Sequence, residues 1–516
     1  MNRVTFLSGC IALAAILAIA HGSAAQPPPA VPVVSTKDGA VAGVKEGGLA
    51  IFRGIPFAAP PAGPLRWRPP QRIAPWPGVR PATAFGPLCW QAARTKAAAT
   101  PPVMSEDCLT LNIWSPALKP SAPLPVMVWI HGGSFIFGAS SNPTYDGAKL
   151  SQQGVIVVSL NYRLGRFGYF AHPALSAERP NDPKGNFGLM DQIAALKWVQ
   201  ANIAAFGGDP ARVTVFGESA GGIAVEQLMA APVARGLFAQ AITESGGGRI
   251  LYYPLKAGAD QPSAERLGET FARAVGLPHA SVADLRALSP EQILTVAPAD
   301  LLRGEIPFVD GKILPLNPHQ AFVAGTEAPV PYIVGFNSLE SPFKPADVDQ
   351  ALDRLTYVTA AQRQSLVSAY PDRSTYLERI VTDLLFTEPA LSHAALHARH
   401  GYPTWLYRFS ILNPAASLMF KGAPHASEVP YVFQTLNTMF VPATANDAAQ
   451  AITIGQYWTH FAKTGDPSAP GQPDWPRYRT ASGRLMDFTN QGPEAKPVPN
   501  RGVMDAIARS YGDPPH

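Results

Sequence analysis

The chain has 516 residues, of which 47% are apolar and 15% charged, and its formal net charge at pH 7 is only +4. This composition is typical of a globular protein that buries a large apolar core. Lysine and arginine are scattered and form no runs, so neither a nucleic-acid partner nor a strongly acidic partner is expected. The 54 prolines predict long extended loops on the surface.

The first 25 residues are typical of a signal peptide. Arg3 precedes an apolar stretch from Phe6 to Ala20, and Ser23-Ala24-Ala25 offers a small-residue cleavage site. The stretch is too short for a good membrane span. It also follows Cys10, where a lipoprotein would carry it before the cysteine, so no stable membrane anchor is expected. Residues 1–25 are therefore interpreted as an export signal.

Export makes the remaining two cysteines informative. Without Cys10 the chain holds Cys89 and Cys108, which form either one bridge or two free thiols. An oxidising compartment favours the bridge. The chain has no Asn-x-Ser/Thr acceptor for glycosylation, which favours a bacterial periplasmic or extracellular protein over a glycosylated eukaryotic one.

The first half of the mature chain reads as a series of strands. Residues 33–57 alternate loosely between turn signals, which predicts antiparallel hairpins. Further strands are predicted at 107–114, 125–130 and 155–160, and apolar residues at helical spacing predict a helix over 189–203.

The pattern Gly217-x-Ser219-x-Gly221 lies between a β-branched run ending at Phe216 and a helical stretch from Ser219 to Ala230. This is the nucleophile-elbow pattern, in which a sharp turn exposes a serine. Five residues of this kind are a common pattern in a glycine-rich chain. The strand before them and the helix after them favour Ser219 as a nucleophile.

Strands at 238–243, 330–335 and 405–409 continue the alternation with helices, while residues 263–302 and 346–399 are mainly helical. Strands alternating with helices predict a mostly parallel sheet with helices on both faces. We therefore expect one α/β domain over residues 26–516, with cap insertions around 250–325 and 340–400.

Several segments together resemble the type-B carboxylesterase family, which includes the cholinesterases. They are Phe52–Ala58, Ser105–Asn112, His131–Phe135, Gly185–Gln192, Gly217–Gly222 and Phe461–Pro467. The resemblance spans nearly the whole mature chain. It implies an α/β-hydrolase fold, hydrolysis of small-molecule esters with no metal or other cofactor, and a disulfide between Cys89 and Cys108.

A serine nucleophile needs a base and an acid that holds the base, and in this fold they follow the serine in the order acid, then histidine. The family's catalytic histidine lies in a Gly-x-x-His-x-x-Glu context, and His425 lies in Gly422–Glu428, which matches it. His516 is expected to end a mobile tail. His393, His397 and His400 share one helical face and could ligate a metal, but they lack the H-E-x-x-H pattern and are expected to be solvated.

The acid is expected to be Glu340, in the loop after the strand at 330–335. The family pattern there is Gly-x-Asn-x-Asp-Glu-Gly, from which this chain departs at Leu339 and Ser341. Asp383 and Glu388 are rivals without a strand-end position.

The resemblance also implies an oxyanion hole made by the backbone amides of Gly133, Ser134 and Ala220, and a supporting role for Ser245 beside the acid and the histidine. The chain is thus identified as a serine ester hydrolase acting through an acyl-enzyme. A lipase or an amidase of the same fold remains an alternative, as does, less favourably, a non-catalytic adhesion module. A cholinesterase is not expected, because Trp90 directly follows Cys89 instead of lying deep inside a longer disulfide loop. A monomer and a dimer both remain open.

Overall fold

The computed structural model describes residues 31–92, 103–247, 249, 252–258, 261–295, 305–340, 348–349, 352 and 358–516. The expected signal peptide, residues 1–25, lies outside this part of the chain. Ser341, one of the two departures from the family pattern beside the expected acid, also lies outside it.

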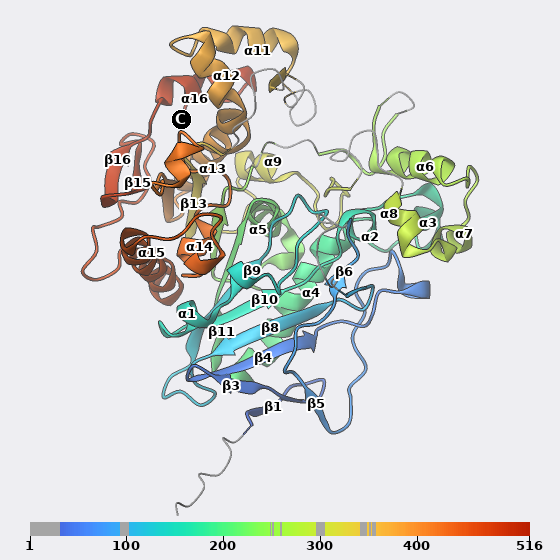
Figure 1. Cartoon of the computed structure of the whole chain (residues 1–516). Helices are drawn as coiled ribbons and strands as arrows, with labels where there is room; N and C mark the ends of the chain where they lie inside the picture. The colour runs from blue at the N-terminus through green and yellow to red at the C-terminus, as the bar shows by residue number, and fades with distance from the viewer. Residues whose placement is uncertain are drawn as a thin grey trace, which may run out of the picture.

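An 11-stranded sheet forms the centre of the described structure, in the order β16-β15-β14-β13-β12-β11-β9-β10-β8-β4-β3 (Figure 1). The strands from β10 to β15 pair in parallel, and the pairs at both ends are antiparallel. This is the mostly parallel sheet that the sequence predicted. Its members are β3 (Val44–Glu46), β4 (Leu49–Pro56), β8 (Thr110–Ser115), β9 (Leu124–Ile130), β10 (Ile156–Leu160), β11 (Gly208–Glu218), β12 (Gln240–Glu244), β13 (Tyr332–Asn337), β14 (Thr404–Phe409), β15 (Arg484–Thr489) and β16 (Gly492–Pro497).

Two smaller sheets involve the N-terminal part of the described chain. One contains β1 (Val33–Ser35), β2 (Ala40–Ala42) and β5 (Val79–Pro81), and the other pairs β6 (Leu88–Cys89) with β7 (Met104–Ser105). The predicted hairpins over 33–57 are therefore divided: β1 and β2 pair in the small sheet, while β3 and β4 form one edge of the large one.

The central strands are buried on both faces, as strand β9 illustrates. Because successive side chains of a strand point to opposite faces, Val126, Val128 and Ile130 enter one apolar cluster while Met127 and Trp129 enter another. A parallel sheet covered on both sides needs such continuous apolar runs. These are the two large apolar cores of the described structure, and a third, small cluster contains Ala171, Ala264 and Phe308.

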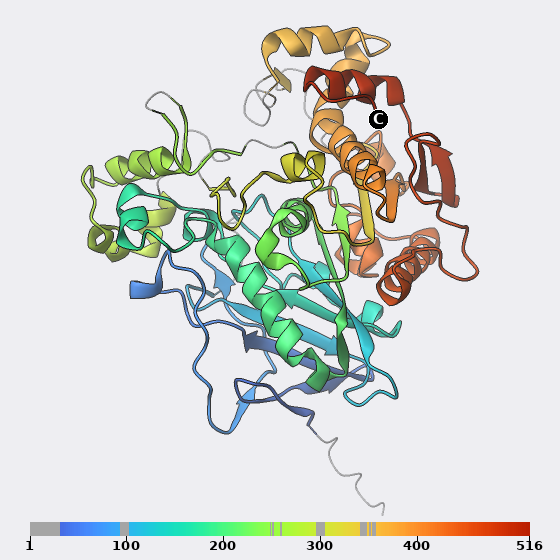
Figure 2. The same cartoon turned by 180° about the vertical axis from the view of Figure 1, so that it is seen from behind.

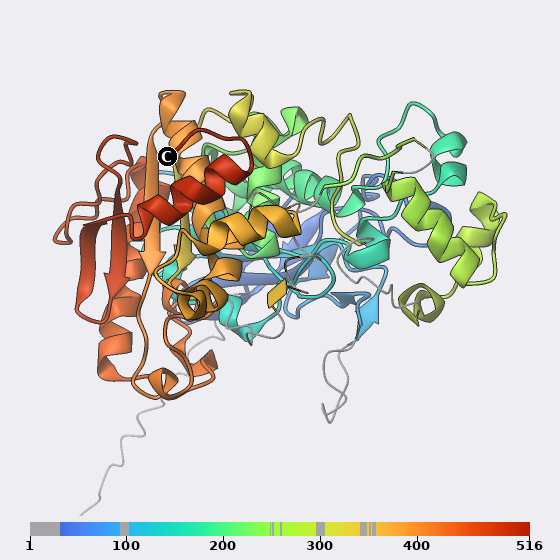
Figure 3. The same cartoon turned by 90° about the horizontal axis from the view of Figure 1, so that it is seen from above.

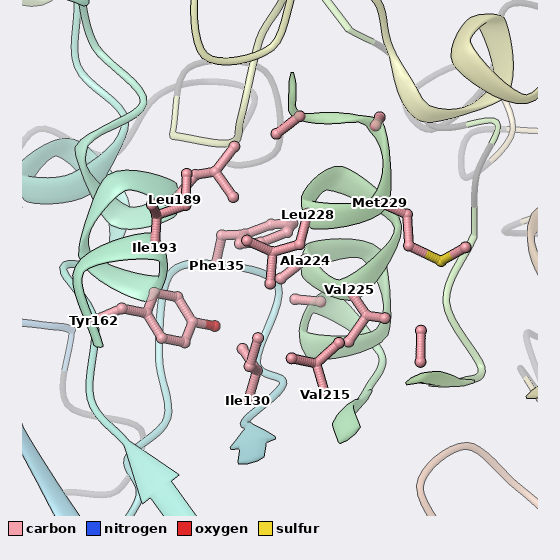
Figure 4. Close-up of a cluster of buried hydrophobic side chains, with 14 of the residues drawn as sticks. Ile130, Phe135, Tyr162, Leu189, Ile193, Val215, Ala224, Val225, Leu228 and Met229 are labelled. Carbon is pink, nitrogen blue, oxygen red and sulfur yellow. The ribbon is translucent and has the colours of Figure 1, made fainter. Parts of the chain in front are cut away.

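Helices cover both faces. On one face lie α4 (Phe187–Asn202), α5 (Ala220–Ala230), α9 (Pro318–Val323) and α13 (Glu388–Arg399), seen from behind in Figure 2. Figure 4 shows Leu189 of α4 and Leu228 of α5 with Phe135 between the two helices. On the opposite face lie α1 (Ala148–Ser151), α14 (Val429–Val432) and α15 (Ala445–Thr464) (Figure 1).

Two further groups of helices stand apart from each other (Figures 1 and 3). One contains α6 (Ala264–Ala274), α7 (Val282–Ala287) and α8 (Pro290–Thr295), next to α3 (Pro173–Glu178). The other contains α11 (Ala360–Val367) and α12 (Arg373–Thr382), next to α16 (Arg501–Ser510). These are the described parts of the two stretches for which the sequence predicted helices. None of the described helices combines the length and the apolar character needed to cross a bilayer.

Candidate active site

The turn between β11 and α5 holds Ser219 at a positive φ of 57°, with ψ −123°, a conformation that residues other than glycine rarely adopt. Both glycines of the motif are required by close backbone contacts. A Cβ on Gly221 would lie 2.0 Å from the Ile130 carbonyl oxygen, and one on Gly217 would lie 2.6 Å from the backbone of Gly221. The serine itself is only half-buried, so its hydroxyl group can meet a ligand.

The loops after β13 and β14 bring Glu340 and His425 together. These strands are parallel neighbours, so their carboxyl ends lie at the same edge of the sheet. Oε2 of Glu340 lies 2.7 Å from Nδ1 of His425, and the backbone N–H of His425 donates to the Glu340 carbonyl oxygen at 3.1 Å. The Ala423 N–H also donates to the Ser338 hydroxyl oxygen at 2.8 Å. The departure at Leu339 therefore leaves the expected pair in contact.

The second oxygen of Glu340 is held as well. The Ser245 hydroxyl donates to Oε1 at 2.7 Å, and the backbone N–H of Asn337 donates to the same atom at 2.5 Å. Only 2% of Glu340 is exposed. Both carboxylate oxygens thus have partners, which fixes the side chain facing the histidine.

The rival acids are engaged elsewhere. Asp383 accepts hydrogen bonds from Tyr370 and Arg379, both at 3.0 Å. Glu388 accepts two hydrogen bonds from Arg249, both at 2.6 Å. The structure records no contact of either carboxylate with His425 among the described residues.

Two expectations about the other histidines were wrong. His393 and His397 are fully buried, not solvated, and His397 contacts the buried Glu327 at 3.0 Å through Nδ1. His516 is 6% exposed and lies 3.2 Å from Glu388, so it does not end a free tail. The physical reason is the same in each case: a buried carboxylate offers the ring a partner that no sequence pattern shows. Within the described part of the chain, no group of three or more His, Cys, Asp or Glu residues is arranged to hold a metal ion.

The loop after β9 lies directly against the elbow. A Cβ on Gly132 would lie 2.7 Å from the Glu218 carbonyl oxygen and 3.1 Å from Cβ of Ser219, so glycine is required there. The backbone amides of Gly133, Ser134 and Ala220 donate no hydrogen bond within the described structure. Gly133 and Ser134 have φ values of 108° and 54°, so this loop also adopts left-handed conformations. Three free amides next to a serine can donate hydrogen bonds to a substrate oxygen on which negative charge develops.

The other ring nitrogen of His425 faces a residue that the sequence analysis did not single out. Nε2 lies 3.1 Å from Oε1 of Glu218, the residue immediately before Ser219. No hydrogen bond joins His425 to Ser219 in the described structure. The ring is 31% exposed, so it can be reached from solvent.

Known proteins of similar sequence and structure identify the family of this chain. Residues 30–502 match the Carboxylesterase family. The chain belongs to the carboxylesterase family. It is 40% identical to the para-nitrobenzyl esterase of Bacillus subtilis over 86% of this chain and 92% of that protein. It is 38% identical to the fumonisin B1 esterase of Sphingopyxis macrogoltabida over 88% and 86% of the two chains. A solved structure of a PNB esterase, 34% identical, superposes with a TM-score of 0.81 over 93% of this chain and 99% of that one.

The chain is accordingly a carboxylic ester hydrolase with the α/β-hydrolase fold. Burial raises the pKa of Glu218 to about 7, with Glu340 adding to the rise and His425 opposing it. Burial alone would lower the pKa of His425, but the Glu218 carboxylate and the hydrogen bond to Glu340 raise it to about 10. Because the pKa of His425 is raised above that of Glu218, the ring holds the proton that the two groups share near neutral pH.

Two more buried carboxyl groups lie around the esterase site. Burial, together with Glu218 and Glu340, raises the pKa of Glu428 to about 8, and its Oε2 accepts from the Asn337 side chain. Burial also raises the pKa of Glu244 well above its usual value, and the indole N–H of Trp458 donates to it at 2.8 Å. The sequence carried a signal for these residues, since each glutamate stands next to an apolar strand or helix where charge is unusual.

A cavity of about 320 Å³ opens beside His425. Its walls are mainly apolar and include Tyr145, Tyr431, Met439 and Phe440. Of the proposed catalytic residues only His425 lines this cavity, while Ser219 and the amides of Gly133, Ser134 and Ala220 do not.

The disulfide implied by the family resemblance is present: Cys89 and Cys108 are joined, with their Cα atoms 5.1 Å apart. Both cysteines are buried in the first of the two cores.

Proposed function

We propose that this esterase hydrolyses small carboxylic esters through a triad of Ser219, His425 and Glu340, by way of an acyl-enzyme. The observation that carries the proposal is the 2.7 Å contact between Glu340 and Nδ1 of His425, on the edge of the sheet where the Ser219 turn also lies. An acid on Nδ1 leaves Nε2 as the atom that accepts a proton.

In the first step, Ser219 attacks the ester carbonyl while His425 takes its proton. For this, Nε2 must exchange its contact with Glu218 for a hydrogen bond with the serine hydroxyl. Catalytic hydrogen bonds that are long or absent in the free enzyme commonly form when substrate binds. His425 is neutral when the shared proton rests on Glu218. The raised pKa of Glu218, about 7, makes its carboxylate a better proton acceptor for the ring than an ordinary glutamate would be.

The oxyanion that forms would be held by the free amides of Gly133, Ser134 and Ala220. Such donors act because they are fixed before the charge develops. The alcohol leaves with the proton from His425. Water then attacks the acyl group on Ser219 by the same sequence of proton transfers, which restores the free serine.

The direct test is Ser219→Ala together with a fluorophosphonate probe. Ser219→Ala should abolish hydrolysis of a nitrophenyl ester and leave the far-UV circular dichroism and the melting temperature unchanged. The probe should label Ser219 alone in the wild type. Turnover that survives the substitution, or a label on another serine, would disprove the assignment.

The substrate class is proposed from the cavity and the relatives. Relatives are named for para-nitrobenzyl and fumonisin B1 esters, and the cavity beside His425 is mainly apolar. We therefore propose uncharged esters with an apolar or aromatic group as substrates. Nitrophenyl and nitrobenzyl esters of increasing acyl length, with the matching anilide as an amide control, would measure this preference.

We also propose that the chain is exported. The leader composition of residues 1–25 and the disulfide between Cys89 and Cys108 support this location. Fractionation of an expressing bacterium should find the processed protein outside the cytoplasm. Unprocessed protein confined to the cytoplasm would contradict it.

A further inference from the structure

A second cavity, of about 510 Å³, is lined by residues of α1, of α15 and of the segments beside them. Figure 1 shows these two helices on one face of the sheet. We call the cavity the glutamine cleft, because Gln152, Gln153, Gln434 and Gln456 all line it. Its volume lies within the range of small-molecule sites, roughly 300–1,000 Å³. It shares no lining residue with the cavity beside His425.

The charges of the cleft are of one sign. Lys149, Lys463 and His460 line it, and none of its lining residues is acidic. Lys149 is exposed and has no ion-pair partner within the described structure. Lys463 donates to the Gln153 carbonyl oxygen at 2.6 Å, which holds its ammonium group at the wall. The neighbouring carboxylate of Asp466 lies outside the lining and faces Arg477 at 4.0 Å.

An unsatisfied donor lies at the cleft. The side-chain amide nitrogen of Gln434 is buried and has no hydrogen-bond partner among the residues that the structure describes. Gly455 of α15 makes room for it: a Cβ at that position would lie 2.3 Å from this nitrogen and 2.9 Å from the amide nitrogen of Gln153. The side-chain amides of Gln434 and Gln153 therefore both pack against α15 at Gly455, where a larger residue would keep them away from the helix. A buried donor without a partner is costly. Because this nitrogen is closed to solvent, it meets a ligand acceptor only when the Gln434 side chain turns away from α15 toward the cleft.

We propose that the glutamine cleft binds a hydroxylated organic anion, with a phosphate or a carboxylate held by Lys149 and Lys463. The lysines select the negative charge, because a charge-assisted hydrogen bond is the strong contact available to them. The glutamine amides select the body of the ligand, because an amide both donates to and accepts from hydroxyl groups. The cavity has room for a ligand body larger than a bare ion.

The test is isothermal titration of the full chain at low ionic strength, after Ser219 has been blocked with a fluorophosphonate so that the ester site cannot contribute. Glucose 6-phosphate tests a phosphate on a hydroxylated body, and glucuronate tests a carboxylate on such a body. Glucose is the hydroxylated body without the charge, and inorganic phosphate is the charge without the body. Saturable binding of one equivalent of glucose 6-phosphate or glucuronate, at least tenfold tighter than of glucose or of phosphate, is expected. Added salt should weaken it.

Two variants locate the binding. Lys149→Gln removes a charge, and Gln434→Leu removes the buried donor while keeping the bulk; each should weaken binding at least fivefold. Lys197→Gln, on an exposed lysine of α4 on the opposite face of the sheet, is the matched control and should bind as the wild type does. Hydrolysis of a nitrophenyl ester by unblocked Lys149→Gln should be unchanged.

Three results would overturn the proposal. They are no saturable binding of either anion at 10 mM, equal affinity for glucose and glucose 6-phosphate, and wild-type affinity in both Lys149→Gln and Gln434→Leu. Phosphate binding as tightly as glucose 6-phosphate would reduce the cleft to an ion site and overturn the assigned class. None of these results bears on the esterase triad, which the Ser219 experiment tests separately.

Discussion

The proton on His425 is the most sensitive quantity in the site, because a carboxylate lies against each of its ring nitrogens. Glu340 contacts Nδ1 at 2.7 Å and Glu218 contacts Nε2 at 3.1 Å. Both negative charges favour the imidazolium, and only the neutral ring can accept the serine proton. Activity should therefore decline on acidification at a pH above 6.5, the usual pKa of histidine.

Glu218→Gln removes one of these charges and should lower the pKa of His425. The acidic limb of the pH profile of kcat/KM should then move to lower pH by about one unit or more, because less base is lost to protonation. The measurement is a series of initial rates on a nitrophenyl ester between pH 5 and 9. A limb at the same pH in the variant and the wild type would show that Glu218 does not govern this titration.

Glu340→Gln should lower kcat by a factor of about a thousand or more, because the amide cannot stabilise the imidazolium and can favour the wrong tautomer. KM and the melting temperature should change little. Asp383→Asn is the control, since Asp383 bonds to Tyr370 and Arg379 and not to His425. A collapse of kcat in Asp383→Asn with an active Glu340→Gln would assign the acid to Asp383.

At the scale of residues, the sequence predicted that Glu340 and His425 lie together, but it did not predict every contact that they make. Ser219, Glu340 and His425 stand at positions fixed by motif or strand end, so their proximity followed from the fold. The contact between His425 and Glu218 depends on the side-chain rotamers of a crowded site, which no local pattern specifies. The same holds for His516, whose burial depends on the distant carboxylate of Glu388.

At the scale of elements, a buried ionic network joins three separate segments. Arg249 lies just after Ser245, pairs with Glu388 at the start of α13, and also contacts Asp513 at 2.6 Å. It is thus the cation that ties α13 and the segment after α16 to the loop behind the proposed acid.

Arg249→Met should reduce the free energy of unfolding by roughly 3–5 kcal/mol, because it takes the guanidinium from the fully buried Glu388 and leaves only the His516 ring beside that carboxylate. Arg53→Met is the control, since its partner Glu46 is half exposed, and its loss should cost less than about 1 kcal/mol. Urea denaturation measures both. Equal losses of unfolding free energy in the two variants would mean that the buried network stabilises the fold no more than an exposed ion pair does.

The elements that the sequence predicted are those with the strongest patterns. The buried strands from β8 to β14 and helix α4 are long, apolar or periodic. By contrast, β16 reads Gly-Pro-Glu-Ala-Lys-Pro and has no buried residue. Two prolines are tolerated there because the strand lies at the edge of the sheet, where one side needs no partner. Tertiary position, not local propensity, makes this segment a strand.

At the scale of the whole molecule, the disulfide closes a loop of 19 residues in sequence separation. Chain entropy assigns such a bridge about 3 kcal/mol of stability. The double variant Cys89→Ser/Cys108→Ser should therefore melt at a lower temperature, whereas its kcat at 25 °C should stay within twofold of the wild type. Differential scanning calorimetry and initial rates test the two halves of this expectation. An unchanged melting temperature would show that the bridge does not limit unfolding.

Ser134, Phe135, Ser219 and Ser245 all have positive φ, and all four lie at or next to the proposed catalytic machinery. Such conformations cost roughly 1–3 kcal/mol each in residues other than glycine. This arrangement bears on adaptation to heat. Selection for a more durable enzyme could gain stability most directly by relaxing these turns, but each relaxation would move a donor or a nucleophile. Heat tolerance should therefore evolve at positions far from the site, in loops and on helix surfaces, while the turns stay as they are.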